Sequence, residues 1–377
     1  MAGIYIHIPF CKQACHYCDF HFSTSLKYKD DMLKAINREI LLQKNFLQNE
    51  KIETIYFGGG TPSLLTSDEI NKITEQIQRY YIADELVEVT LETNPDDLSS
   101  QKIAALKHTP VNRFSIGIQS FFNEDLKWMN RAHQAKEAEF AIKASQDAGF
   151  ENLTVDLIYG YPLLTKEKWD LNINQVLAMD IPHVSCYSMT VEPKTALASF
   201  IKKGIDKNMD DTKSAEQFLH LSAKLQENGF EHYEISNFAK GNKYSVHNTN
   251  YWRGVKYLGI GPSAHSFDGK DRQWNIANNA LYMQSLGKDN IPAEKEFLSP
   301  KDRVNEYIMT ALRTMWGLDL NKINSDFPVF KAEISKNMNQ FFEKDWIEEK
   351  DNHIILTTKG KLYADHIAAE LFIEDGF

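Results

Sequence analysis

The regular alternation of short β-rich runs with amphipathic helical patterns constrains the fold of this chain more than any other feature. Strands are predicted at 3–8, 52–57, 86–92, 111–118, 152–160 and 183–189. Between them lie helical patterns, such as the one in which Met32, Ile36 and Ile40 recur every four residues. Strands that alternate with helices run parallel and are joined by right-handed crossovers. About six such units are too few for a closed eight-fold barrel, so the sequence predicts an α/β fold with an open, partial (β/α)6 barrel.

The pattern changes twice further along the chain. After a helix near 211–228, the region 230–290 is rich in Asn, Gly and aromatic residues, and we expect it to be irregular with short strands. From Ser299 onward, helices at 300–315 and 329–343 precede a hairpin and a last helix capped at Thr357 or Thr358. This order is typical of a small α+β winged-helix-like module. The predicted domains are therefore a barrel at 1–235, an irregular connecting region at 236–298, and a C-terminal domain at 299–377.

Charge and composition exclude several classes of function. The formal net charge of −10, together with the acidic character of 299–377, argues against a nucleic-acid partner, in spite of the winged-helix pattern. No apolar run approaches the ~18 residues that a membrane-spanning helix needs. The N-terminus has no basic region or cleavage site of a signal peptide. Three of the four cysteines are bunched, which is more typical of a metal site than of a disulfide framework. We therefore expect a protein of the reducing cytoplasm.

Chemically distinctive residues fall at the predicted carboxyl ends of the strands, where α/β barrels place their ligand sites. The cysteine-rich segment FCKQACHYCDFHFS (10–23) follows the first strand. In order after the next five strands come the Gly58-Gly59-Gly60-Thr61 turn, Glu92, Gln119, Asp156 (within the strand), and Tyr187 with Thr190. Their convergence at one edge of the barrel predicts the functional site.

The three bunched cysteines, Cys11, Cys15 and Cys18, are compatible with two kinds of metal site. A zinc ion needs four ligands, and His16 or His21 is close enough in sequence to complete a Cys₃His set. An iron–sulfur cubane held by three thiolates would instead leave one iron open to a small molecule. Three structural thiols without a metal are a third alternative. The spacing alone leaves these alternatives open.

Several motifs taken together resemble one known superfamily. Cys-x₃-Cys-x₂-Cys after a first strand, with the aromatic Tyr17 just before the last cysteine, is similar to the radical S-adenosylmethionine (SAM) superfamily. The strings YIHIPFC, GGGTPS, LETNP, SIGIQSF, DLIYGYP and HNTNYW narrow the resemblance to the oxygen-independent coproporphyrinogen III oxidase-like group and, within it, to its haem-chaperone branch. The similarity runs nearly from end to end and includes the C-terminal domain.

The resemblance implies a set of cofactors. Cys11, Cys15 and Cys18 would ligate a [4Fe-4S] cluster whose open iron chelates SAM, and an electron donor would reduce that cluster. Gly59, Gly60 and Thr61 would offer backbone groups to the methionine part of SAM, because glycine lets a ligand approach the main chain closely. The other implied SAM contacts are Tyr5 near the cluster, Tyr17, Glu92 at the ribose, Arg131 at the carboxylate, Gln119, Asp156 and Thr190 at the adenosine or a second SAM site, and His265 in LGIGPSAHSF.

Two of these residues have other interpretations when only the residue types are considered. Arg131 has the planar fork that suits a carboxylate, but it could equally form a surface ion pair with Glu124 or Asp125. Asp156 lies inside the apolar string TVDLIYG, where a carboxylate is costly unless it is paired or functional. Half of a buried ion pair is therefore the alternative for Asp156.

Phe20 separates this chain from the oxidases it resembles. Those enzymes carry a further cysteine two residues after the third one, and here that position is Phe20. Cluster ligation by three thiolates does not need the extra thiol, but decarboxylation of coproporphyrinogen becomes doubtful. Only four residues precede Tyr5, so we also expect that the N-terminal extension of the oxidases is absent. Cys186, within a strand, is expected to be a small buried hydrophobe.

The string HNTNYW (247–252) is the second informative site. His247 beside two large aromatic residues could ligate haem iron, with the rings packed on the macrocycle. From the residues alone, a hydrogen-bonded loop histidine is the alternative. The resemblance favours haem, because the same string marks the chaperone branch. His7 and His133 are expected to be structural.

These expectations lead to three hypotheses of function. The first is a haem chaperone that holds a [4Fe-4S] cluster, SAM and haem, and passes haem to an acceptor such as a membrane-associated haemoprotein. The second is an oxygen-independent coproporphyrinogen III oxidase of porphyrin biosynthesis. The third is a radical SAM enzyme with another substrate. No residue is assigned a catalytic role, and whether the chain is an enzyme is left open.

Overall fold

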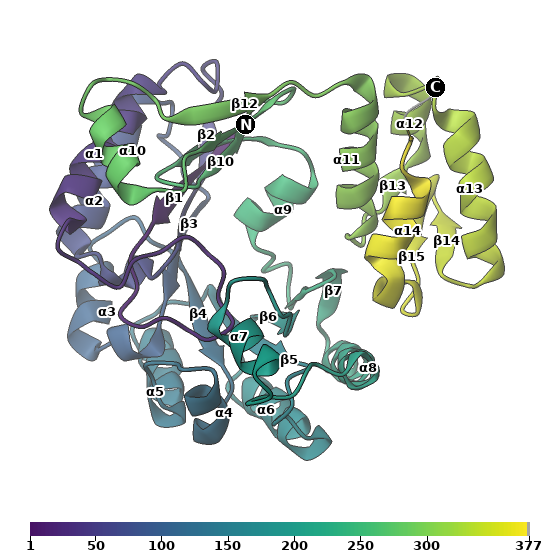
Figure 1. Cartoon of the computed structure of the whole chain (residues 1–377), viewed down its shortest axis with the longest axis horizontal. Helices are drawn as coiled ribbons and strands as arrows, with labels where there is room; N and C mark the ends of the chain where they lie inside the picture. Colours follow the sequence, from purple (N-terminus) through teal and green to yellow (C-terminus); the bar gives the residue numbers. More distant parts are fainter. Residues whose placement is uncertain (375–377) are drawn as a thin grey trace.

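The computed structural model describes residues 1–374, and its central feature is a run of parallel strands (Figure 1). All six strands predicted in the first 190 residues are present: β1 (Ala2–Ile8), β2 (Ile52–Gly59), β3 (Glu88–Thr93), β4 (Arg113–Gln119), β5 (Leu153–Tyr159) and β6 (His183–Ser188). Each pairs in parallel with the next, as the alternation of strands and helices requires. The predicted α/β partial barrel is confirmed.

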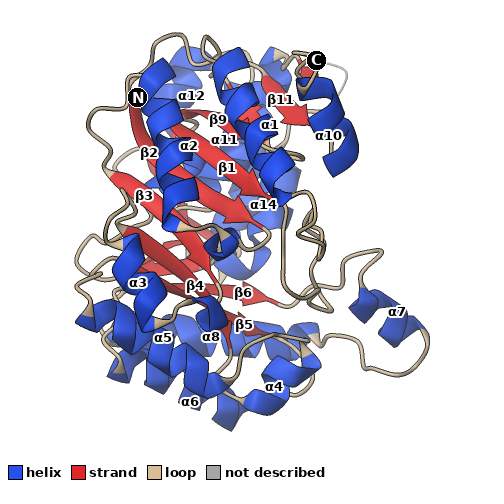
Figure 2. Ribbon diagram, turned by 90° about the vertical axis from the view of Figure 1, so that its left-hand side faces the viewer, coloured by secondary structure: helices blue, strands red, loops and turns tan. Residues whose placement is uncertain are grey.

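The helices that join these strands cover one face of the sheet (Figure 2). They are α1 (Lys29–Leu42), α2 (Ser67–Tyr80), α3 (Ser100–Leu106), α4 (Asn123–Trp128), α5 (Ala135–Asp147) and α6 (Lys166–Ala178). After β6, α8 (Asp211–Glu227) packs on the same side against α6 and β5, whereas α7 (Ala196–Lys202) lies apart from the sheet. Side chains of a strand point alternately to its two faces. On the helix-covered face every second residue is apolar and buried, as in Ile4, Ile6, Ile8, Ile55, Phe57, Val89, Leu91, Phe114, Ile116, Ile118, Val155, Leu157 and Val184. Cys186 belongs to the same core, as expected.

The opposite, inner face of the same strands is polar. Its residues are the alternate ones, among them Tyr5, Thr54, Tyr56, Glu88, Glu92, Arg113, Ser115 and Asp156. They contact one another, as when Ser115 lies 3.4 Å from an Asp156 oxygen and Tyr56 donates to Glu92. One strand pattern thus builds both an apolar layer under the helices and a polar interior.

The region 230–290 contains short strands, as expected, but these strands are not a separate unit. β7 (Glu231–Glu234) and β8 (Asn237–Ala239) extend the sheet beyond β6. β9 (Lys256–Ile260) pairs in parallel with β1, and β10 (His265–Phe267), β11 (Arg272–Asn275) and β12 (Ala293–Glu296) follow as antiparallel strands. The order is β12-β11-β10-β9-β1-β2-β3-β4-β5-β6-β8-β7, so the sheet does not close. The domain boundaries at 235 and 298 stay a prediction, because the sheet continues across the first of them.

Two helices of this region pack on different sides of the sheet. α10 (Asn279–Leu286) lies against α1 on the outside. α9 (Val246–Trp252) contacts β2 and β9 and, on its other side, α11 of the C-terminal domain. In Figure 1, α9 lies between the sheet and that domain. α9 therefore occupies the interior of the open barrel.

The C-terminal domain has its own core and a three-stranded sheet. Its elements are α11 (Pro300–Leu312), β13 (Leu318–Asp319), α12 (Leu320–Asp326), α13 (Lys331–Glu343), β14 (Ile347–Lys350), β15 (His353–Leu356) and α14 (Ala364–Leu371). The sheet order is β13-β15-β14, and the core includes Val304, Ile308, Ile334, Phe341 and Ile367. The sequence predicted that Thr357 or Thr358 would cap the last helix, but α14 begins later, at Ala364. The Thr357 hydroxyl instead accepts from Gly360 N (3.1 Å) at the 3₁₀ turn that precedes α14.

The structure describes residues 1–374, and none of the helices there has the character of a membrane span. Within that range, every helix falls short of the length and apolar character that crossing a bilayer requires.

Candidate functional site

The cysteine loop, residues 9–28, links β1 to α1 and is fixed by main-chain hydrogen bonds to neighbouring strand ends. Cys11 N donates to Ser23 O (3.0 Å) within the loop, and Thr61 N donates to Phe10 O (2.6 Å) from the turn after β2. Lys12 forms ion pairs with Asp96 (2.7 Å) and Asp97 in the turn after β3. The loop is therefore anchored across the carboxyl ends of β1, β2 and β3.

The three thiols of this loop are partly exposed and free. Arg131 Nη1 donates to Cys15 Sγ at 3.4 Å. Burial raises the pKa of the Cys11 thiol, and it raises that of Cys18 to about 12, so a bound cation must displace these protons. Among residues 1–374, no three His, Cys, Asp or Glu side chains meet closely enough to hold a single metal ion. A cubane has a different requirement, because each thiolate binds a different iron.

Arg131, in the segment after α4, reaches the carboxyl ends of β3 and β4. Its Nη2 donates to Asn94 Oδ1 and to Gly117 O, both at 2.7 Å. The Nε of Arg131 is buried and has no hydrogen-bond partner. The alternative surface ion pair is not what the structure shows, because Lys168 pairs with both Glu124 and Asp125. Arg131 is thus an inward-facing cation with an unused donor.

The glycines after β2 are required by packing as well as by backbone geometry. Gly59 has φ +104°, and a Cβ there would lie 2.6 Å from the ring of His7. A Cβ on Gly60 would lie 2.6 Å from Phe10 O. His7 in turn is buried, and its Nε2 hydrogen-bonds His21 O (2.9 Å). The turn therefore packs directly on the end of β1, with the main chain of residues 58–61 bordering the cysteine loop.

Glu92 faces the polar interior at the end of β3. Its carboxylate accepts from Tyr56 OH (2.8 Å) and from Gly59 N (3.1 Å). Burial, and then the nearby Asp156 charge, raise the pKa of Glu92 to about 7. Tyr5 lies beside this group, with its ring 6.0 Å from that of Tyr56.

Asp156 and Gln119 occupy the same interior from β5 and β4. Asp156 contacts the Ser115 hydroxyl (3.4 and 3.5 Å), and burial raises its pKa to about 6. No ion pair to Asp156 exists within residues 1–374, so the buried-pair alternative has no support there. Gln119 has φ +62°, a region that non-glycine residues rarely adopt, and its Oε1 is buried without a partner. This oxygen is therefore available to accept a hydrogen bond from a ligand or an ordered water.

Three other predicted contacts lie near the same edge of the sheet. Tyr17 packs partly buried against the main core. Thr190 is exposed just after β6. His265 is exposed at the start of β10, where its ring stacks on Trp274 at 6.0 Å. His265 is close to Tyr5 in the sheet, because Gly259, which pairs with Tyr5, packs against the His265 main chain.

His247 is not at this edge but deeper in the interior, on α9. Its side chain is 1% exposed, and burial lowers its pKa to about 3. Nδ1 hydrogen-bonds Thr54 Oγ1 and Nε2 hydrogen-bonds Tyr251 OH, both at 2.8 Å. Iron ligation by His247, which stays a prediction, would require one of these hydrogen bonds to break. His133, buried and bonded to Ile118 O (3.1 Å), has the structural position that was expected.

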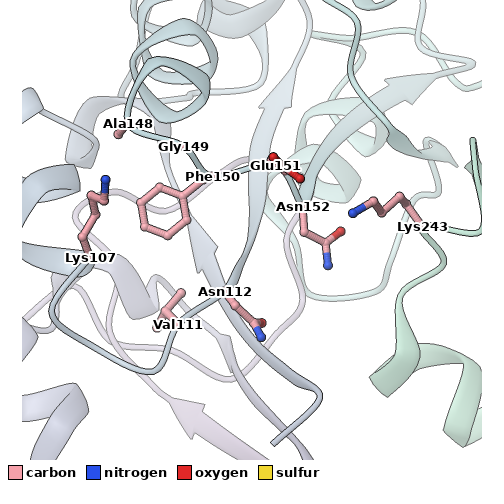
Figure 3. Close-up of a pocket in the computed structure, with 9 residues that line it drawn as sticks. All are labelled: Lys107, Val111, Asn112, Ala148, Gly149, Phe150, Glu151, Asn152 and Lys243. Atoms are coloured by element: carbon pink, nitrogen blue, oxygen red, sulfur yellow. The ribbon is translucent and has the colours of Figure 1, made fainter.

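A surface hollow lies at the opposite end of the strands (Figure 3). It measures about 400 Å³, and Figure 3 shows Lys107 and Lys243 on opposite sides of it. Its amides are already used by the fold: Asn112 Oδ1 accepts from Val89 N, and Asn152 Oδ1 accepts from Arg113. The chemistry-bearing residues are therefore not in this hollow.

The donor set at the carboxyl ends fits a thiolate-bound cluster with an organic ligand beside it. It combines three thiols on one loop, an arginine beside one of them, and buried polar atoms that lack partners. Sequence reasoning missed Asn94 and Tyr56, which hold Arg131 and Glu92. The sequence held a signal for both residues. Asn94 is in the LETNP string, and the alternation of side chains along a strand directs Tyr56 to the same face as Thr54 and Gly58.

Comparisons with known proteins match nearly the whole chain. The model of the radical SAM superfamily matches residues 5–174, and that of the HemN C-terminal domain matches residues 298–363. A haem chaperone HemW of Bacillus subtilis is 31% identical, with 97% of this chain and 98% of the relative covered. HemW of Lactococcus lactis is 30% identical over 98% and 97%, and that of Synechocystis 31% over 99% and 97%.

Among solved structures, the coproporphyrinogen III oxidase HemN from Escherichia coli, described as a radical SAM enzyme, superposes with a TM-score of 0.85. The match covers 98% of this chain and 90% of that chain at 20% identity, so it shows a shared fold. The radical SAM match implies a [4Fe-4S] cluster and SAM.

Proposed function

This chain belongs to the family of the haem chaperone HemW, within the radical SAM superfamily, and from this premise we propose that it binds a [4Fe-4S] cluster, SAM and haem, and passes haem to an acceptor haemoprotein. The observation that carries the proposal is the identity of about 30% to HemW proteins of several bacteria over nearly their whole length. The oxidase resembles this chain in fold, but at lower identity.

In this proposal, Cys11, Cys15 and Cys18 ligate the cluster. Their position on one anchored loop supports this assignment, as does the donor that Arg131 offers to Cys15. When bound, the cluster and SAM supply a low-potential electron and a reactive sulfonium. The cationic Arg131 stabilises negative charge on the thiolates beside it. Thiolate ligands and an external electron donor suit a reducing compartment, which is the cytoplasm.

The proposed SAM site uses the polar ends of the strands. Gly59, Gly60 and Thr61 offer main-chain groups, and Tyr5 and Tyr17 flank the cluster. With a pKa near 7, Glu92 is able either to accept or to donate a hydrogen bond at a ribose hydroxyl near neutral pH. Gln119, Asp156, Thr190, His265 and the free Nε of Arg131 complete the proposed polar contacts with SAM.

Haem is proposed to bind over the mouth of the barrel. Two aromatic side chains at this end, Phe20 (66% exposed) and Tyr187 (44% exposed), provide apolar surface for a macrocycle. Phe20 occupies the position at which the oxidases have a fourth cysteine. The acceptor is proposed to be a haemoprotein, such as a membrane-associated one, and nucleic acid is not a proposed partner.

The test is anaerobic reconstitution followed by titration with SAM and haemin. We expect iron and sulfide for one cubane per chain, saturable binding of both ligands, and transfer of haem to apomyoglobin used as a surrogate acceptor. Cys15→Ala should abolish the cluster, whereas Cys186→Ala, a buried thiol outside the loop, should retain it. Conversion of coproporphyrinogen III to protoporphyrinogen with SAM consumption would favour the oxidase instead, and a tetrahedral zinc in place of iron would overturn both.

A further inference from the structure

His247 lies behind the proposed SAM site rather than in it. Its ring stacks on that of Tyr56, with ring centroids 5.1 Å apart and an interplanar angle of 29°. The hydroxyl of the same tyrosine donates to Glu92 Oε1 at 2.8 Å. His247 and Glu92 are therefore connected through a single intervening side chain.

The position of the His247 ring is fixed from several sides. Thr54 and Tyr251 hold its two nitrogens. On β1, Gly3 leaves no spare room, because a Cβ there would lie 2.8 Å from Thr54 Oγ1 and 3.1 Å from His247 Cε1. A ring confined in this way has one orientation, which it imposes on the ring stacked against it.

The start of α9 is itself tied to the sheet. Glu88, the first residue of β3, accepts from Val246 N and from His247 N, both at 2.9 Å. Glu88 lies 3.8 Å from Arg113, and both side chains are 1% exposed. Glu88 and Glu92 are four residues apart on the same strand and face the same interior. Glu88 thus holds α9 at the amino end of β3, whereas Tyr56 hydrogen-bonds Glu92 at the carboxyl end of the same strand.

We propose that His247 is a positioning residue for the SAM site, and not an iron ligand: its ring holds Tyr56 so that the tyrosine hydroxyl keeps Glu92 directed at the ribose of SAM. This inference rests on the proposed function, because it needs SAM bound at Glu92. It assigns to the HNTNYW string a role in the affinity for SAM. Because burial keeps the ring neutral, His247 adds no charge beside Glu92.

The test compares binding of SAM and of haemin in five variants of the full-length, anaerobically reconstituted protein. In His247→Ala the support of Tyr56 is removed, and we expect SAM affinity to fall about tenfold, as is usual when a group that orients a ligating residue is lost. Tyr56→Phe should give a similar fall. The double variant should be no weaker than the weaker single variant, because both changes break one connection.

His247→Phe separates positioning from ligation. A phenyl ring keeps the stack on Tyr56 but cannot bind iron, so we expect it to recover most of the SAM affinity lost in His247→Ala. Cluster content and the Soret spectrum with haemin should be those of the wild type in all variants. His183→Phe is the matched control: His183 is also buried and bonded to a tyrosine (Tyr233, 2.7 Å), but it lies at the amino end of β6. It should lower the melting temperature without changing SAM affinity.

Wild-type SAM affinity in both His247→Ala and Tyr56→Phe would overturn the inference, and so would a shifted Soret band in His247→Phe. If His247→Ala fails to fold, Tyr56→Phe and His247→Phe carry the comparison. Failure of the wild-type protein to bind SAM or haemin would contradict the proposed function itself. That result is distinguishable from wild-type binding that is insensitive to His247.

Discussion

At the residue scale, the glycine turn after β2 shows two separate requirements for glycine. Gly59 needs a positive φ, which costs an L-residue roughly 1–2 kcal/mol. It also leaves no room for a Cβ, because the His7 ring is in contact. Gly149 has a positive φ too (+87°), but nothing lies within 4 Å of its potential Cβ. A comparison of the two positions therefore distinguishes the cost of backbone strain from the cost of a steric clash.

Gly59→Ala should destabilise the protein more than Gly149→Ala. We expect about 1–2 kcal/mol for Gly149→Ala, from backbone conformation alone. For Gly59→Ala, overpacking against His7 should add about 1–3 kcal/mol. Chemical or thermal unfolding measures both. Equal losses of unfolding free energy in the two variants would show that the His7 ring moves aside without an energetic cost.

Arg131→Lys tests the contribution of the guanidinium group that lies beside Cys15. One ammonium group cannot reach Asn94, Gly117 and Cys15 together, as the planar guanidinium does. We expect the cluster to form, a lower melting temperature, and SAM affinity reduced at least about tenfold, since a hydrogen bond to a charged group contributes about 1.5–3 kcal/mol. Arg79→Lys, on the exposed surface of α2, is the control. Unchanged SAM affinity in Arg131→Lys would remove Arg131 from the SAM site.

At the scale of elements, one buried carboxylate connects α1 to the strands beyond β9. Glu39 of α1 accepts from Gly261 N (2.8 Å), Asn275 Nδ2 (2.7 Å) and Tyr282 OH (2.5 Å). These donors come from the turn after β9, from β11 and from α10. Burial nevertheless raises the pKa of Glu39 to about 7. Helix and sheet are thus joined by a group that titrates near neutral pH.

The raised pKa of Glu39 makes stability depend on pH. An unfolded glutamate titrates near 4.3, so between about pH 4.5 and 7 the folded state binds more protons than the unfolded state. This contribution to stability therefore falls as pH rises through that window. Glu39→Gln cannot titrate, so the melting temperature of the wild type relative to the variant should fall from pH 5 to pH 8. Glu75→Gln, an exposed change on α2, should show no such trend, and a constant difference for Glu39→Gln would contradict the assignment.

At the scale of the whole molecule, the C-terminal domain joins the barrel through β7 and α9. Ile235 N donates to Arg313 O (3.0 Å), and Met315 N donates to Tyr233 O (2.9 Å). Beside these bonds, Arg253, just after α9, lies 4.2 Å from the centroid of the Trp316 ring. The domain therefore contacts the same helix that packs behind Glu92.

Trp316→Ala should loosen this junction while leaving both cores folded. A cation–π contact contributes roughly 0.5–2 kcal/mol, and the domain keeps its own apolar core. We expect faster proteolytic cleavage near Phe297, which is exposed between β12 and α11, with unchanged circular dichroism. Trp346→Ala is the contrasting variant: Trp346 stacks on Tyr363 (4.1 Å) within the domain, and its loss should unfold the domain itself. Cleavage at the wild-type rate in Trp316→Ala would show that the main-chain bonds suffice.

The sequence determined what depends on neighbours along the chain. Short β-rich runs marked six strands, apolar repeats marked the helices between them, and three cysteines on one loop marked the site. Because the carboxyl ends of parallel strands meet at one edge, Glu92, Gln119 and Asp156 could be placed together from the sequence alone. Arg131 was placed with them by its resemblance to a known motif.

Only the tertiary structure decided how distant segments combine. Nothing local in 256–260 shows that β9 pairs with β1, and nothing in VHNTNYW shows that His247 is buried against Tyr56. Strand pairing and burial depend on contacts between residues some 200 positions apart, as between Thr54 and His247 or between Glu39 and Asn275. Such contacts form only when the whole sheet is assembled, because no single segment can bury its polar groups alone.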